Sequence, residues 1–127
     1  MPTEYVKNWF LRADEDLAVI EAIINEDNIS PNSICFHAQQ AGEKYLKGFL
    51  AHHALHVRKI HSFKTLIIEC INIDQDFKEL LESASTLDQF YIESHYPDDY
   101  VEFSLAQARE GYVEAKKIKE LILLKVL

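Results

Sequence analysis

Residues 31–56 read PNSICFHAQQAGEKYLKGFLAHHALH, and this stretch decides the fold. At about 100° per residue, its apolar side chains cover more than half of a helix circumference, which is typical of a helix buried on several sides. We predict a central helix that begins between residues 31 and 34, where Ser30 can cap it and Pro31 suits its first turn, and that runs to about His56. Gly42 and Gly48 are costly inside a helix, so both predict close packing against a neighbour.

Similar periodicity flanks this helix on both sides. Apolar residues recur at three- and four-residue steps over about residues 3–25, 62–72, 77–93 and from about 102 to the C-terminus. No strand pattern survives, and three Gly and three Pro leave few turns for an all-β fold. The predicted fold class is all-α: an up-and-down helical bundle of four long helices plus one short helix, in a single domain over residues 1–127. Cys35 and Cys70 have apolar neighbours and are expected to be reduced core thiols.

The charge balance limits the classes of partner. The chain has 13 Lys and Arg against 21 Asp and Glu, a net charge of −8, which argues against binding to duplex nucleic acid. No uncharged apolar run approaches the roughly 18 residues that span a bilayer, and the N-terminal residues lack the apolar segment of a signal peptide. We therefore expect a cytoplasmic protein without membrane contact. Three Gly cannot build a glycine-rich phosphate loop, so a phosphate would be held by side chains or a helix N-terminus.

One narrow polar stripe interrupts the apolar surface of the central helix. His37, Gln40, Lys44 and Lys47 follow one another at i, i+3, i+7 and i+10 and therefore share one face. Lysine suits phosphate as a compact, strongly hydrated charge, and the histidine and glutamine would orient a ligand or a partner. The stripe is equally typical of a solvated helix face, on which Glu43 and Lys47 form an ordinary i, i+4 pair.

The sequence predicts neither a metal centre nor a catalytic nucleophile. His52 and His56 have the i, i+4 spacing of two ligands on one helix face, but no third ligand accompanies them and no HExxH occurs. No GxSxG motif is present, and neither cysteine has an evidently electropositive setting. We therefore expect no metal-ligating and no catalytic residues.

The run Cys35–Lys47, CFHAQQAGEKYLK, closely resembles the second-helix signature of the HEPN family, small helical domains named for nucleotide binding in higher eukaryotes and prokaryotes. Three shorter segments agree with the family in order. ADEDL at 13–17 is similar to its A-x-x-D-L, HSFKTL at 61–66 lies where it carries H-D-L-x-x-L, and YPD at 96–98 resembles the end of its R-Y-P-D loop. Ser62 and His95 depart from the family's aspartate and arginine.

This resemblance implies a stand-alone prokaryotic HEPN protein of the type associated with minimal nucleotidyltransferases. It implies an accessory subunit that binds a nucleotide or the partner's substrate in a toxin-antitoxin-like pair, with ATP or GTP as the ligand and no other cofactor. It also implies a homodimer, which a surplus of large aromatic side chains independently favours. The ligand-binding residues would then be His37, Gln40, Lys44, Lys47, His61, His95 and Tyr96.

Catalytic activity is not expected from this resemblance. Ribonucleases of the family carry an Arg-x4-6-His motif, and none of Arg12, Arg58 and Arg109 has a histidine at that distance. Two alternatives remain open. The first is an RNA-cleaving HEPN toxin with an atypical active site built from His37, His61 or His95. The second is a purely structural protein-interaction domain.

Overall fold

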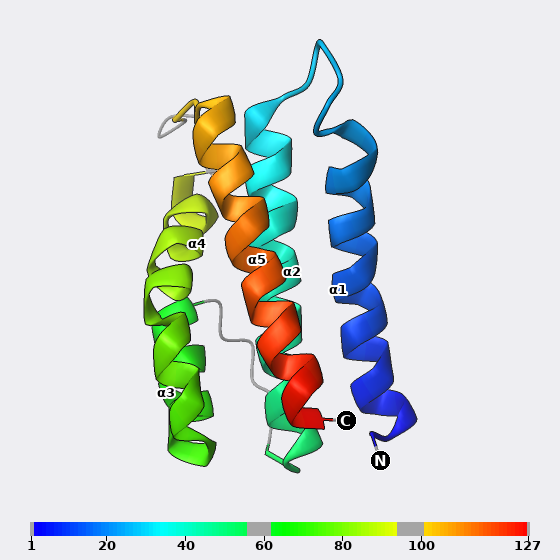
Figure 1. The fold of residues 1–127 in the computed structure, drawn as a ribbon, viewed down its shortest axis with the longest axis vertical. Coiled ribbons are helices and arrows are strands. Elements are labelled where there is room, and N and C mark those ends of the chain that lie inside the picture. Colours follow the sequence, from blue (N-terminus) through cyan, green and yellow to red (C-terminus); the bar gives the residue numbers. More distant parts are fainter. Residues whose placement is uncertain (1, 56–61, 94–100, 127) are drawn as a thin grey trace.

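The computed structural model describes residues 2–55, 62–93 and 101–126 (Figure 1). In chain order its elements are α1 (Glu4–Ile23), α2 (Pro31–His52), α3 (Phe63–Ile73), the 3-10 helix η1 (Gln75–Leu80), α4 (Leu81–Glu93) and α5 (Leu105–Val126). No strand occurs within these described ranges. The predicted all-α bundle is confirmed, with α3 as its short helix.

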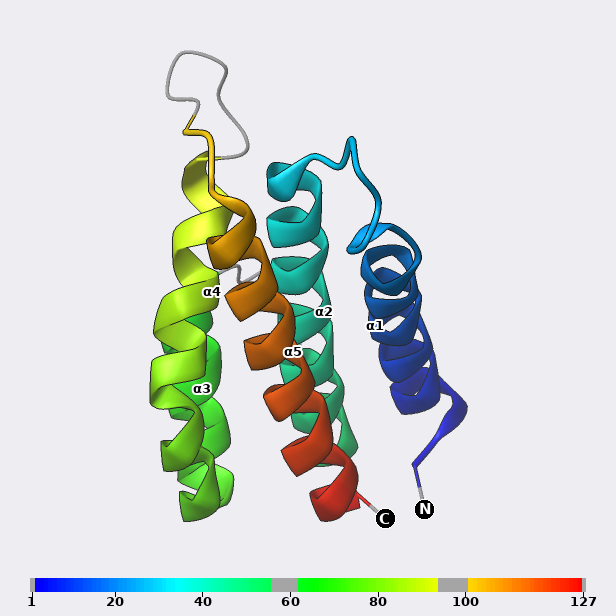
Figure 2. The ribbon, with the colours of Figure 1, turned by 45° about the horizontal axis from the view of Figure 1, so that its top comes forward.

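The helices pack side by side around α2 (Figures 1 and 2). α1 lies on one side of α2, α3 and α4 lie on the other, and α5 runs along α2 between them. α1 and α2 are antiparallel, as are α4 and α5, and both chain ends lie at the same end of the bundle. More than half of the residues of α2 are buried, because it contacts α1, α3, α4 and α5. The prediction of a central second helix is therefore confirmed.

Small polar side chains set where the first three α-helices begin. Thr3, Ser30 and Ser62 each accept a hydrogen bond from the backbone N–H three residues further on, at 3.2, 3.4 and 3.4 Å. Each bond satisfies one of the donors that a helix N-terminus leaves unpaired. Pro31 follows Ser30 at the first position of α2, where its missing N–H costs nothing. The cap predicted at Ser30 is confirmed, and Ser62 caps α3 in the same way.

The second helix ends at His52, four residues before the predicted end at His56. Ala54 has a left-handed backbone with φ 59°, and the N–H of Leu55 donates back to the carbonyl of Leu50 at 3.1 Å. This closing bond belongs to the Schellman motif, which normally has glycine at the left-handed position. Alanine there gives no sequence signal for a helix end, which is why the prediction ran too long.

Two further boundaries differ from the predicted ones. The stretch predicted as one helix from about residue 77 begins with η1, because the Asp74 side chain accepts from the Asp76 N–H at 2.9 Å and tightens the first turns. α5 begins at Leu105, and not near 102, because Ser104 and Gln107 cap each other's backbone N–H groups at 3.1 and 2.9 Å. This reciprocal pair is a capping box.

One continuous apolar core draws side chains from every helix. Its largest fully buried members include Tyr45, Phe49 and Phe77. Cys35 and Cys70 are free and buried, as predicted, and burial raises the pKa of each thiol to about 12. None of the described helices is long and apolar enough to cross a membrane.

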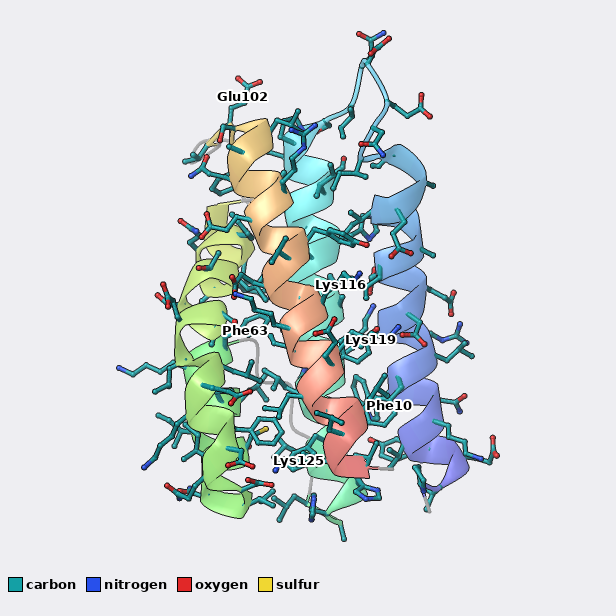
Figure 3. The ribbon with its side chains drawn as sticks, in the orientation of Figure 1. Phe10, Phe63, Glu102, Lys116, Lys119 and Lys125 are labelled. Atoms are coloured by element: carbon teal, nitrogen blue, oxygen red, sulfur yellow. The ribbon has the colours of Figure 1, made fainter. Side chains whose placement is uncertain are left out.

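The glycines of α2 lie in close contact with side chains of neighbouring helices, as predicted. A Cβ at Gly42 would lie 3.0 Å from Phe63 and from Leu87. A Cβ at Gly48 would lie 2.5 Å from the ring of Phe10, which reaches from α1 toward the bundle (Figure 3). Gly48 therefore allows α1 to pack closely on α2, and that contact positions the polar side chains described next.

Candidate functional site

The polar stripe of α2 runs along its contact with α1, which we call the α1/α2 seam. His37 and Lys44, seven residues apart, lie on the same side of α2 and are half-buried, as is Gln40. Lys47 is only 4% exposed. The common face predicted from spacing is therefore present, but burial separates its members: Lys47 is enclosed, whereas the other three reach the surface.

Asp16 of α1 joins two of the stripe residues through one carboxylate. Its Oδ1 lies 2.8 Å from His37 Nδ1, and Lys44 Nζ donates to its Oδ2 at 2.6 Å. Asp16 is only 8% exposed, because Ala13 and Leu17 beside it pack into the core. A carboxylate this deeply placed is stable only with strong hydrogen-bond partners. We call Asp16, His37 and Lys44 the seam cluster.

The seam cluster leaves some binding capacity at the surface. An ammonium group has three N–H donors, of which the bond to Asp16 uses one. The Lys44 side chain is 26% exposed, so a ligand outside the bundle can reach its remaining donors. The second ring nitrogen of His37 is not used by the bond to Asp16. Asp16 thus fixes the position of both side chains without burying them.

The remaining stripe residues bond along α2 itself. Gln40 Nε2 donates to Gln39 Oε1 at 2.7 Å, and Lys47 Nζ donates to Glu43 Oε2 at 3.3 Å. The ordinary i, i+4 pair of Glu43 with Lys47 is therefore present, although both side chains are only 6% exposed. Lys47 Nζ also lies 5.9 Å from the ring centroid of Trp9 on α1. Lys47 therefore contacts Glu43 and Trp9 inside the seam and hardly reaches the surface.

Three further polar contacts fix α1 in place. Lys119 of α5 reaches toward α1 (Figure 3), where its Nζ lies 3.1 Å from Asp14 Oδ1. The Tyr45 hydroxyl donates to the same Asp14 carboxylate, and burial together with this bond raises the pKa of Tyr45. Tyr112 of α5 donates to Glu21 at 2.6 Å. These contacts hold the α1 side of the seam in register with the α2 side.

Three predicted site residues, His61, His95 and Tyr96, lie outside the described residues. Of the four described residues, His37 and Lys44 are joined through Asp16, and Gln40 and Lys47 lie on the same face of α2. In the ranges that the structure describes, no three His, Cys, Asp or Glu side chains converge as metal ligands.

Partial burial and the neighbouring His53 lower the pKa of His52.

Sequence reasoning missed Asp16 as a site residue. Its bonds connect residues 21 and 28 positions apart in the chain, so helical spacing within α2 could not identify it. A signal was nevertheless present, since Asp16 is the second aspartate of the ADEDL segment and stands at the aspartate position of the family's A-x-x-D-L, to which that segment is similar. The ADEDL segment and the second-helix signature therefore supply the two sides of one contact between α1 and α2.

The fold and the site together define a class of protein: a helical bundle with a charged seam between its first two helices. A family model described as HEPN domain matches residues 6–126. The chain belongs to the HEPN domain family.

Two solved structures are similar over almost their whole length. The crystal structure of TT1696 from Thermus thermophilus has a TM-score of 0.80 and 26% identity, covering 97% of this chain and 99% of that one. The crystal structure of ST0689, an archaeal HEPN homologue, has a TM-score of 0.74 and 26% identity, covering 96% and 98%. No curated protein matches the sequence. The predicted HEPN membership and fold are therefore confirmed.

Proposed function

We propose that this chain is a non-catalytic HEPN protein that binds a nucleotide, ATP or GTP, or helps a minimal nucleotidyltransferase partner to bind its substrate. The observation that carries this proposal is the seam cluster. Asp16 holds Lys44 in a fixed position at the surface of a protein whose net charge of −8 repels anions at long range. Under such a field, an anion is retained only where directed donors are positioned locally.

The sequence supports a binding role over a catalytic one. The Arg-x4-6-His motif of the family's ribonucleases is absent around Arg12, Arg58 and Arg109. General acid-base cleavage of RNA by that apparatus is therefore not available to this chain.

Calorimetry of ATP and GTP against the purified protein tests nucleotide binding. Lys44→Met removes the surface ammonium while retaining an unbranched side chain, and Lys116→Met on the exposed face of α5 is the matched control. We expect Lys44→Met to weaken binding about tenfold or more, as loss of one charge-assisted hydrogen bond implies, and Lys116→Met to leave it unchanged. Absence of binding in the wild type would refute the proposal.

The accessory-subunit role is tested by co-purification from the native operon, followed by mass measurement of the complex. A nucleotidyltransferase of small size recovered in stoichiometric amount is the expected result. Recovery of the chain alone, at its own mass or at a multiple of it, would reject that partner while leaving nucleotide binding to be judged by calorimetry.

Self-association is part of the proposal. Several large apolar side chains are exposed on the bundle surface, including Leu11 at 51%, Leu81 at 48% and Leu124 at 74%. Only some of the aromatic residues that the sequence has in surplus contribute to this exposed apolar surface, because Phe90 and Phe103 are buried in the core. Where such side chains gather into one patch, they favour an interface. Sedimentation is expected to show a dimer, and a monomer at every concentration would contradict this.

The alternative of RNA cleavage has one specific observation in its favour, the bond of 2.8 Å between Asp16 and His37. A carboxylate that orients an imidazole is the arrangement of a general acid or base. Because that pair would act without the family's motif, we expect no turnover of labelled RNA. Turnover that disappears in His37→Ala would establish the alternative. A protein that neither cleaves RNA nor binds a nucleotide would be a structural interaction domain.

A further inference from the structure

A pocket opens at the surface of the α1/α2 seam, next to the seam cluster. Its volume is about 230 Å³, and it is lined by Tyr5, Asn8, Trp9, Arg12 and Lys44. The four α1 residues recur at i, i+3, i+4 and i+7, so one face of that helix supplies most of the wall. The inner surface of the pocket is apolar, so Arg12 and Lys44 line it with their carbon stems and their charged groups lie outside it.

The two aromatic residues form a preassembled wall. Tyr5 and Trp9 pack edge to face, with ring centroids 6.2 Å apart and planes at 80°. Lys47, with its Nζ 5.9 Å from the indole centroid, supports Trp9 from α2. Because the two planes are nearly perpendicular, a third ring can stack on the face of one ring and meet the edge of the other, at little cost in conformational entropy.

The Trp9 indole N–H is an independent sign of a missing partner. Its Nε1 is buried, and it is the one buried side-chain nitrogen or oxygen of the described chain that has no hydrogen-bond partner. An unpaired buried donor is unfavourable and calls for an explanation. Because Nε1 has no accessible surface in this conformation, an acceptor on a ligand would satisfy it only if the indole turned toward the pocket as the ligand entered.

The two cations can bind an anion despite their carboxylate neighbours. Arg12 pairs with Glu15, but both side chains are more than half exposed, so solvent screens the pair and a ligand can replace Glu15. Lys44 retains its bond to Asp16 and still has donors to spare. The two side chains thus offer one guanidinium and one ammonium at the rim of the same aromatic pocket.

We propose that this pocket binds a small aromatic anion, with the ring against Tyr5 and Trp9 and the anionic group on Arg12 and Lys44. This inference rests on the proposed function, under which the ring is the base and the anion is the phosphate chain of ATP or GTP. A volume of about 230 Å³ is small for a whole nucleotide. The ring therefore enters the pocket, and the phosphates extend along the surface.

The experiment uses the only tryptophan of the chain. Trp9 fluorescence is titrated with ATP, GTP, adenosine and tripolyphosphate, excited at the red edge of the indole band, where nucleotides do not absorb. Free N-acetyltryptophanamide corrects for residual absorption. Calorimetry with the same four probes is run in parallel. The variants are Tyr5→Ala, Arg12→Ala and Lys44→Met. Arg109→Ala, at an exposed position of α5, is the matched control for the loss of an arginine charge.

We expect ATP or GTP to change Trp9 fluorescence with the affinity found by calorimetry, and adenosine and tripolyphosphate to bind at least about tenfold more weakly, since each makes half of the contacts. Tyr5→Ala and Arg12→Ala should each weaken ATP binding about tenfold, while Arg109→Ala stays within about twofold. Far-UV circular dichroism checks that all variants keep the wild-type helicity.

The outcomes separate this inference from the proposed function. Nucleotide heat without a Trp9 response, and with equal affinity in Arg12→Ala and Arg109→Ala, would overturn the pocket and leave nucleotide binding standing. No heat with any nucleotide would overturn both. Equal binding of adenosine and ATP would overturn the anionic half of the site. A Trp9 response to a purified protein partner, and none to nucleotides, would mean that the pocket receives a protein side chain.

Discussion

Replacing Asp16 with alanine tests whether the seam cluster holds α1 on α2. The substitution removes the acceptor of two bonds, at 2.8 Å to His37 and at 2.6 Å to Lys44. A hydrogen bond to a charged group contributes about 1.5–3 kcal/mol, and two bonds to one carboxylate do not add fully. Lys44 can turn toward water after the change, which keeps the loss below that of a fully buried pair. We expect Asp16→Ala to lower the free energy of unfolding by about 2–4 kcal/mol.

The assay is urea unfolding followed by far-UV circular dichroism. With a slope of about 1.5–2 kcal/mol/M, the expected loss moves the midpoint down by about 1–2.7 M at unchanged slope. Glu15→Ala is the control, because it removes the neighbouring carboxylate from an exposed pair with Arg12. That change should alter the unfolding free energy by no more than about 0.5 kcal/mol.

A double-mutant cycle assigns the loss to the bond itself. In a Lys44→Met background, Asp16→Ala should cost about 1–3 kcal/mol less than in the wild type, because the partner is already gone. Purely additive effects of the two changes would refute the reasoning. An equal effect of Asp16→Ala and Glu15→Ala would refute it as well.

Three further predictions concern the rest of the bundle. Because burial raises the thiol pKa of Cys35 and Cys70 to about 12, neither forms thiolate near neutral pH, and Ellman's reagent should label them only as the protein unfolds; rapid labelling of the native protein would contradict this. Ala54→Gly should stabilise by about 1 kcal/mol in urea, since it relieves the left-handed alanine that ends α2; no gain would mean that the strain is absent. Gly48→Ala should cost about 1 kcal/mol, because crowding against Phe10 outweighs the better helix propensity; in a Phe10→Ala background the cost should vanish, and a persisting cost would reject crowding as its cause.

The local parts of the fold could be predicted from the sequence because they depend on neighbouring residues. The wide apolar face of α2, the caps at Ser30 and Ser62 and the close packing at Gly42 and Gly48 all follow from spacing or from one residue's backbone preference. The end of α2 could not, because Ala54 adopts a conformation that its side chain disfavours. The closing bond from the Leu55 N–H to the Leu50 carbonyl accompanies this conformation, and the side chain at position 54 does not signal it.

Only the α2 side of the candidate site could be predicted from the sequence. His37 and Lys44 are seven residues apart, which fixes them on one face of α2. Their carboxylate partner Asp16 depends on the rotation and height of α1 against α2, which no pattern within either helix contains. The burial of Lys47 has the same origin, since it follows from the position of Trp9 across the seam. Crossing geometry is therefore the information that the sequence patterns lack.

The charges around the seam pocket predict how nucleotide affinity depends on salt. Arg12 is matched by Glu15 and Lys44 by Asp16, so the local net charge is close to zero. Salt weakens the contacts of the exposed Arg12 and of Lys44 with phosphate but not the ring contact, so ATP affinity there should fall less than at a cationic patch without aromatic contact. The basic run on α5 that contains Lys116 and Lys117 offers such a patch. We therefore expect ATP affinity, measured by Trp9 fluorescence, to fall only moderately from low to physiological ionic strength. A steep fall that Lys117→Met reduces and Lys44→Met does not would transfer the site to α5.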